Sequence, residues 1–293
     1  MRVLVVTLHS GEAEYERSVA AVAAQESVSV EHVVFSGLSN LEAHRRCYQA
    51  IEDRHGCFDI AVKVDADMVL RSPGVLRAIG EWFVDQPALD HAQLAIHDFY
   101  TDRAIMGLQV FSPSARWGQL AESLFVDASP TVPGRRAVIW RPPLPIADHS
   151  PDPSPLQAFR FGVHRAQKAF QRDRRRVKGS QAREQWQTLV RTWEAFHETG
   201  EVRRGLAVFG ADLVWRGEVD TSDGGYRSEA VDAAFLEAPL TTAALRSALA
   251  HRWSRPAVRG LGRITALGPR GTVRSLAAGL RRPRPSSTGE WIK

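Results

Sequence analysis

Two carboxylates lie two residues apart in the segment from Lys63 to Met68 (KVDADM), directly after a run of apolar residues. In an extended chain, side chains two positions apart point to the same side, so Asp65 and Asp67 can present both carboxylates to one cation. Carboxylates this close repel each other unless a hard cation neutralises them. Such a cation can also stabilise a diphosphate as a leaving group. The spacing therefore predicts a divalent-metal site that acts on a phosphorylated ligand.

A bare Asp-x-Asp is also common on protein surfaces, where one carboxylate could cap the helix expected at Ser72 and the other could pair with Lys63. Placement favours the metal interpretation, because open α/β sheets bind ligands at the carboxyl ends of their strands. Lys63 shares a face with Asp65 by strand period and is our first choice for a cation at the diphosphate, with Arg45 on the preceding predicted helix as the second. The alternative for Lys63 is a simple ion pair with Asp59 or Asp65.

The first part of the chain alternates β-branched runs with helical periodicity, which positions the motif. Such alternation with short loops predicts an α/β fold in which a mainly parallel sheet is covered on both faces. The expected strands are residues 2–8, 30–35, 59–64, 94–99 and 105–112, and the expected helices are residues 14–25, 40–55 and 72–83.

The pattern changes after residue 112. Residues 127–155 are rich in proline and are expected to form a loop, and residues 156–197 are strongly helical with a break near 178–180. A further helix is expected over 202–215. We therefore expect a nucleotide-binding domain over 1–155, a helical extension packed on it over 156–250, and a basic, partly disordered tail over 251–293.

Composition sets broad limits on the type of protein. The 293 residues contain 38 Lys and Arg against 33 Asp and Glu, and the stretch from Arg252 to Arg284 is rich in Arg and nearly free of acid. Such a stretch favours peripheral contact with an anionic membrane at the inner face, or is simply solvated; nucleic acid is not the expected partner. No signal peptide and no apolar run of about 18 residues is found, so a cytoplasmic protein is expected. Two cysteines do not form a disulfide framework.

The order of elements carries a family resemblance. Strand, helix, strand ending in a turn, helix and strand ending in Asp65-Ala66-Asp67 together resemble family 2 glycosyltransferases of the GT-A fold, over residues 1–112. Residues 18–25 (SVAAVAAQ) are similar to that family's first helix, which often ends in Ala-Gln. The resemblance implies a Rossmann-like GT-A sandwich that binds nucleotide-diphospho-sugars. It also implies a UDP- or GDP-linked donor, a Mn²⁺ or Mg²⁺ ion, and transfer of a hexosyl group to a hydroxyl of a sugar or lipid-linked acceptor.

The resemblance also suggests site residues. By position alone, Thr7, His9 and Glu12 after the first strand are candidates for donor binding. GT-A enzymes often add a histidine to the metal, and here that is His149, with His164 as the alternative. The acids available for catalysis are Asp98, Asp102 and Asp148, of which Asp98 and Asp148 are the candidates, although no general base stands out by motif.

The chain departs from the family where Ser36-Gly37-Leu38-Ser39 replaces an Asp-rich turn that contacts the nucleotide base. Because no general base stands out by motif, the leading alternative is a non-catalytic GT-A-fold protein that binds a nucleotide or acts as an adaptor. A sugar-phosphate nucleotidyltransferase fits less well, since only Gly11 remains of the Gly-rich loop expected there. A phosphatase of the haloacid dehalogenase type would have its Asp-x-Asp after the first strand. On the helix of His164, Arg165 and Lys168 could also serve a phosphate or be solvated.

Overall fold

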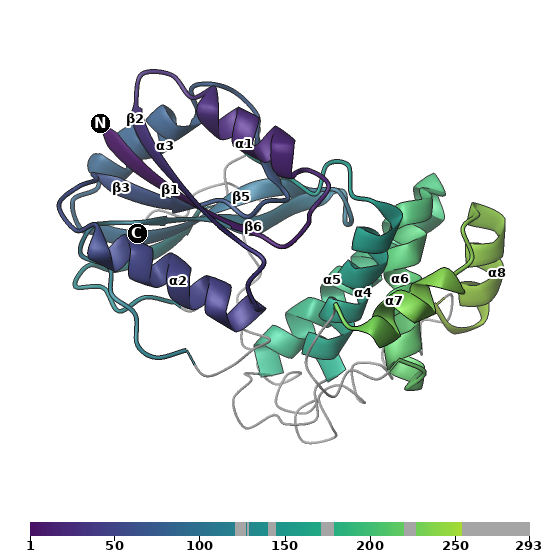
Figure 1. Ribbon diagram of the computed structural model, residues 1–293. Coiled ribbons are helices and arrows are strands. Elements are labelled where there is room, and N and C mark those ends of the chain that lie inside the picture. The colour runs from purple at the N-terminus through teal and green to yellow at the C-terminus, as the bar shows by residue number, and fades with distance from the viewer. Residues whose placement is uncertain (121–126, 128, 140–144, 171–178, 220–226, 254–293) are drawn as a thin grey trace, which may run out of the picture.

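A computed structural model describes residues 1–253 apart from 121–126, 128, 140–144, 171–178 and 220–226 (Figure 1). The basic tail predicted after Trp253 lies outside the described residues. Within them, one sheet is joined to a group of helices from the C-terminal half of the chain. No helix in the described ranges is both long and apolar enough to cross a membrane.

The sheet has the strand order β2-β1-β3-β6-β5-β8-β4, and β7 also pairs with β5. Four of the seven described strand pairings are parallel, so the predicted mainly parallel sheet is present with antiparallel pairs inserted into it. The strands are β1 (Arg2–His9), β2 (Ser29–Ser36), β3 (Ile60–Lys63), β4 (Met68–Leu70), β5 (Leu89–Asp98), β6 (Arg103–Phe111), β7 (Arg135–Ile139) and β8 (Ala147–His149).

The antiparallel insertion has a local cause. Only four residues, 99–102, join β5 to β6, and Asp102 has a positive φ of 52°. A connection this short can only join antiparallel neighbours, so β5 and β6 form a hairpin, and β6 then pairs antiparallel with β3. The expected loop over 127–155 is wrong in two places, because β7 and β8 lie within it. Both are short strands that form by pairing with β5 and, for β8, with β4.

Three helices cover the two faces of the sheet, with α1 (Tyr15–Ala23) and α3 (Val75–Val84) on one face and α2 (Asn40–Asp53) on the other (Figure 1). Alternation along β1 explains the two layers, since successive strand side chains point to opposite faces. Val3 and Val5 belong to the apolar core that contains side chains of α3, whereas Leu4 and Val6 belong to the apolar core that contains side chains of α2. The predicted helix at 72–83 begins at Val75, just after Pro73.

The C-terminal half is helical, as predicted, and has its own apolar core of tryptophan, phenylalanine and leucine side chains that includes Trp186, Trp253 and Leu189. α4 packs against α5, α6 and α7. Its helices are α4 (Pro155–Phe170), α5 (Gly179–Thr199), α6 (Val202–Arg216), α7 (Glu229–Leu236) and α8 (Thr242–Trp253).

Candidate functional site

The Asp-x-Asp motif lies in the turn between β3 and β4. The Met68 amide donates to the Asp65 carbonyl at 2.8 Å, and Ala66 and Asp67 are turn residues. The expected extended geometry is therefore wrong here, and the two carboxylates have different partners. The turn itself is held against β1, since the Ala66 amide donates to the Leu8 carbonyl at 3.1 Å. Asp65 and Asp67 thus flank the carboxyl end of β1.

Asp67 faces His149 on β8. Its Oδ2 lies 3.2 Å from His149 Nε2 and accepts a hydrogen bond from Ser150 Oγ at 3.1 Å. The Ser150 amide donates to the Asp67 carbonyl at 2.6 Å. Antiparallel pairing of β4 with β8 places Met68 opposite His149, so the sheet itself brings these residues together. Of the two histidines proposed as metal ligands, His149 is the one that contacts Asp67; that it binds a metal stays a prediction.

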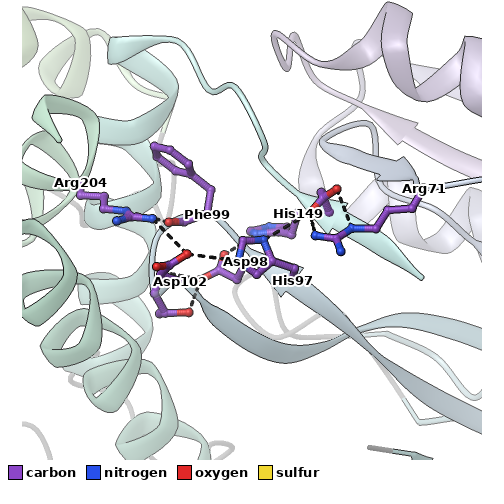
Figure 2. Close-up of polar contacts among 9 residues, drawn as sticks. Arg71, His97, Asp98, Phe99, Asp102, His149 and Arg204 are labelled. Carbon is purple, nitrogen blue, oxygen red and sulfur yellow. Dashed lines mark hydrogen bonds and ion pairs between the residues drawn. The ribbon is translucent and has the colours of Figure 1, made fainter. Parts of the chain in front are cut away.

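Asp98 lies behind His149 (Figure 2). One Asp98 oxygen contacts His149 Nδ1 at 2.7 Å, and the other accepts from the amide and hydroxyl of Thr101 at 2.8 and 2.6 Å. Asp98 is only 1% exposed, so the structure places this predicted catalytic acid where it holds the imidazole. Burial alone would lower the pKa of His149, but Asp67 and Asp98 outweigh it and raise that pKa to about 10.

Asp148, the second predicted catalytic acid, precedes His149 on β8 but has other partners. Arg71 binds it through two nitrogens, at 2.9 and 2.5 Å, and His97 Nδ1 lies 3.2 Å from it. A bidentate guanidinium contact of this kind is strong. Asp148 would have to leave Arg71 before it could accept a proton from a substrate.

Lys63 occupies the other side of the motif. Its Nζ lies 2.8 Å from the Asp65 carboxylate and 3.0 Å from Asp127, and the residue is 2% exposed. Burial lowers the pKa of Lys63, but Asp127 and Asp65 raise it well above its usual value. Conversely, Lys63 and His44 bring the pKa of Asp127 well below normal against the effect of burial. The structure shows the alternative for Lys63, an ion pair with Asp65; its role as a cation at a diphosphate stays a prediction.

Asp127 is the residue that sequence reasoning missed. It follows no strand or motif, yet it receives contacts from Lys63, from His44 Nε2 at 3.3 Å and from Gln109 Nε2 at 3.3 Å. The available signal was indirect. A lysine in a buried strand needs compensating carboxylates, and one aspartate of the motif alone leaves it incompletely paired.

A cleft of about 410 Å³ opens where β1 and β2 end, a volume within the range of small-molecule sites. Two parallel strands end here, which is where open α/β sheets bind ligands. Positive φ angles of 96° at Gly11 and 72° at Gly37 let the backbone turn away from the cleft. The lining residues are His9, Ser10, Gly11, Ser36, Gly37, Leu38 and Arg227.

The three residues predicted to bind the donor differ in their position relative to this cleft. His9 lines it, stacks on Tyr15 at 3.8 Å, and places Nδ1 3.2 Å from Ser36 Oγ. Glu12 contacts the cleft residue Arg227 at 3.2 Å. Thr7 is fully buried and bonds to His32 Nε2 at 2.9 Å, away from the lining.

Two further candidates have other surroundings. Arg45 is exposed on α2, donates to the Leu120 carbonyl at 2.8 Å and does not line the cleft. His164 on α4 has a pKa well below normal because of burial and because Lys168 and Arg165 lie nearby. These surroundings differ from those of His149, which has carboxylates on both nitrogens.

The residues can be tested for their fit to a divalent metal. In the described part of the chain, no three His, Cys, Asp or Glu side chains group closely enough to hold an ion by themselves. Asp67 and His149 nevertheless form a suitable pair once His149 gives up its Nε2 proton, because Asp98 engages Nδ1 and leaves Nε2 facing Asp67. Metal-binding histidines are oriented by carboxylates in this way. Mg²⁺ at phosphate sites commonly uses one or two carboxylates and completes its shell with phosphate and water oxygens.

Comparisons with known proteins give little beyond this geometry. No family model matches the sequence, and no curated protein matches it. Among solved structures, a mannosyltransferase from Pyrobaculum calidifontis, determined in complex with GDP-Man and Mn²⁺, aligns with a TM-score of 0.40 and 14% identity. The alignment covers 95% of this chain and 87% of that chain.

Proposed function

We propose that this chain is a metal-dependent glycosyltransferase that transfers a hexosyl group from a nucleoside diphosphate sugar to an acceptor hydroxyl. The observation that supports it best is the chain of contacts Asp67–His149–Asp98 at the carboxyl end of β1, where the cleft also begins. The Ala66 amide donates to the Leu8 carbonyl, and the next residue in the chain, His9, lines the cleft. The Asp-x-Asp motif and the cleft are therefore neighbours.

Each group has a role in this proposal. The cleft at the ends of β1 and β2 takes the nucleoside, with His9 as a stacking surface and Arg227 at the rim. Asp67 and His149 hold the divalent ion, which when bound would neutralise the diphosphate as the sugar–phosphate bond breaks. Asp98 acts as a positioning residue, because it fixes which imidazole nitrogen faces Asp67.

The acceptor side is less well defined. Asp148 is the remaining predicted acid, and it would serve as general base only after release from Arg71. Because Arg71 occupies Asp148, a second candidate function is favoured, in which the protein binds the nucleotide-sugar without transferring it. Release of nucleoside diphosphate in the presence of acceptor sugars or lipid-linked acceptors distinguishes the two.

A thermal-shift screen tests the proposal. UDP- and GDP-linked sugars would be added to the full chain with Mn²⁺, with Mg²⁺, or with a chelator. We expect one nucleotide class to raise the melting temperature by several degrees only when metal is present, since a ligand at 100 times its Kd stabilises by about 2.7 kcal/mol. The proposal is wrong if no nucleotide-sugar shifts the midpoint, or if the chelator leaves the shift unchanged.

A further inference from the structure

Ser150, which directly follows β8, has a backbone conformation that its residue type disfavours. Its φ of 47° lies in the left-handed region, where a side chain crowds the backbone and glycine is the usual residue. The next residue is Pro151, whose ring favours an extended backbone at the residue before it. Ser150 is also only 1% exposed. Strain of this kind persists only where the surrounding structure enforces it, and it is common at functional sites.

The surroundings of Ser150 fix the chain on both sides of it. On one side, the Phe99 amide donates to the His149 carbonyl at 3.1 Å. On the other side, the Asp152 amide donates to Glu14 Oε1 at 3.1 Å, and Glu14 is itself buried in the loop between β1 and α1. Contacts from two different loops of the sheet half therefore hold the strained residue in place.

Both polar groups of Ser150 are directed at Asp67. The Ser150 amide donates to the Asp67 carbonyl at 2.6 Å, and the Ser150 hydroxyl donates to Asp67 Oδ2 at 3.1 Å. The same oxygen, Oδ2, lies 3.2 Å from His149 Nε2. Since φ is the rotation about the N–Cα bond, it sets the direction of the Ser150 side chain relative to its amide. The strained angle thus lets one residue hold the main chain and the carboxylate of Asp67 together.

We infer that Ser150 is a positioning residue for Asp67, and that its strained backbone aims the Asp67 carboxylate at the divalent ion. The inference rests on the proposed function, in which Asp67 and His149 hold that ion. Ser150 then does for Asp67 what Asp98 does for His149, because each holds a metal ligand by a hydrogen bond from the protein. Carboxylates that bind metals are themselves hydrogen-bonded, and loss of such a partner weakens metal binding by about 10- to 100-fold.

Two substitutions at Ser150 separate its hydroxyl from its backbone. Mn²⁺ alone would be titrated into the full chain and followed by the electron paramagnetic resonance of the free ion, and melting temperatures would be measured without metal. Ser150→Gly and Ser150→Ala both lack the hydroxyl, so we expect both to weaken Mn²⁺ binding by about tenfold or more. Only glycine relieves the backbone, so Ser150→Gly should melt at least about 2 °C above Ser150→Ala. Metal affinity should follow the hydroxyl, while stability should follow the backbone.

Ser27 provides the matched control. It is also a serine with a positive φ, of 62°, but it is exposed and precedes β2, at the end of the sheet away from Asp67. Ser27→Gly should melt above Ser27→Ala for the same backbone reason. Both Ser27 variants should bind Mn²⁺ as wild type does.

The outcomes separate the role of Ser150 from the proposed function. Absence of Mn²⁺ binding by the wild type overturns the positioning role, as does a loss of affinity that follows melting temperature and is confined to Ser150→Ala. Wild-type Mn²⁺ affinity in both Ser150 variants also overturns it, and leaves the glycosyltransferase proposal standing if a nucleotide-sugar binds only with metal. Mn²⁺ binding that depends on the Ser150 hydroxyl, in a protein that responds to no nucleotide-sugar, supports the positioning role and contradicts the glycosyltransferase proposal.

Discussion

The two halves of the molecule bury very different side chains. At the carboxyl edge of the sheet, charged groups such as Lys63, Asp98 and His149 are almost fully enclosed and are compensated by one another. The helical half instead encloses a cluster of aromatic rings around Trp186 and Trp253, whose ring centres lie 5.4 Å apart.

This difference separates residues that stabilise from residues that act. Aromatic packing contributes directly to stability through buried apolar area. Buried ion pairs contribute little, since the cost of removing charges from water roughly offsets their attraction, and apolar replacements often stabilise. The proposed ligand binding would account for these charges at the sheet edge, where folding gains little from them. Among the described residues of the helical half, one comparable acid is buried: Asp212 accepts from Trp253 Nε1 at 3.0 Å and pairs with Arg216 and Arg252.

The largest effect is expected from a change at the crossing of two helices in the helical half. At Gly162 on α4, an added Cβ would lie 1.6 Å from the Ala207 carbonyl oxygen on α6. Backbone cannot move away as a side chain can, so Gly162→Ala should force the helices apart. We expect a loss of about 3 kcal/mol or more in the free energy of unfolding, measured as a drop of several degrees in the melting temperature.

The matched control is Gly74→Ala in the sheet half, where an added Cβ meets nothing within 4 Å. That change should alter stability by less than about 1 kcal/mol. Equal melting temperatures for the two variants would contradict the tight contact of α4 with α6.

A smaller effect is expected from pH in the metal-free protein. Because Asp67 and Asp98 raise the folded-state pKa of His149 to about 10, its contribution to stability is fully present below about pH 6.5 and is lost as pH rises through about 10. The free energy of unfolding should therefore fall by a few kcal/mol between these pH values. Urea titrations at a series of pH values would measure this fall.

His149→Gln provides the comparison, because its side chain does not titrate. The variant should be less stable than wild type at pH 6 and should lose most of the slope between pH 7 and 10. If wild type and variant have parallel stability profiles, His149 is not held as an imidazolium between the two carboxylates.

Much of the sheet half could be predicted from sequence because its elements are local. β1 and β3 are continuous apolar runs, and the alternation of Val3 and Val5 with Leu4 and Val6 sets the two cores. β7 and β8 could not be predicted, since they are short, lie among prolines and exist only through pairing with distant strands.

The site could be predicted only in part, for the same reason. Asp65, Asp67 and Lys63 were found because they follow a buried strand, and His149 was found through family resemblance. Their partners depend on long-range pairing. Asp67 meets His149 because β4 pairs with β8, and Asp127 reaches Lys63 from a segment without a motif. Asp98 was named as an acid, but only the fold shows it enclosed behind His149.

The central claim is that Asp67 and His149 bind a divalent ion together with a nucleoside diphosphate. Calorimetric titration of UDP and GDP, with and without Mn²⁺, on wild type, Asp67→Asn and the Asp65→Asn/Asp67→Asn double variant tests it most directly, with Asp85→Asn at the exposed end of α3 as control. We predict Mn²⁺-dependent binding to wild type and Asp85→Asn, at least tenfold weaker binding to Asp67→Asn, and none to the double variant. If the Asp67→Asn protein binds the nucleotide as tightly as wild type in Mn²⁺, the account is contradicted.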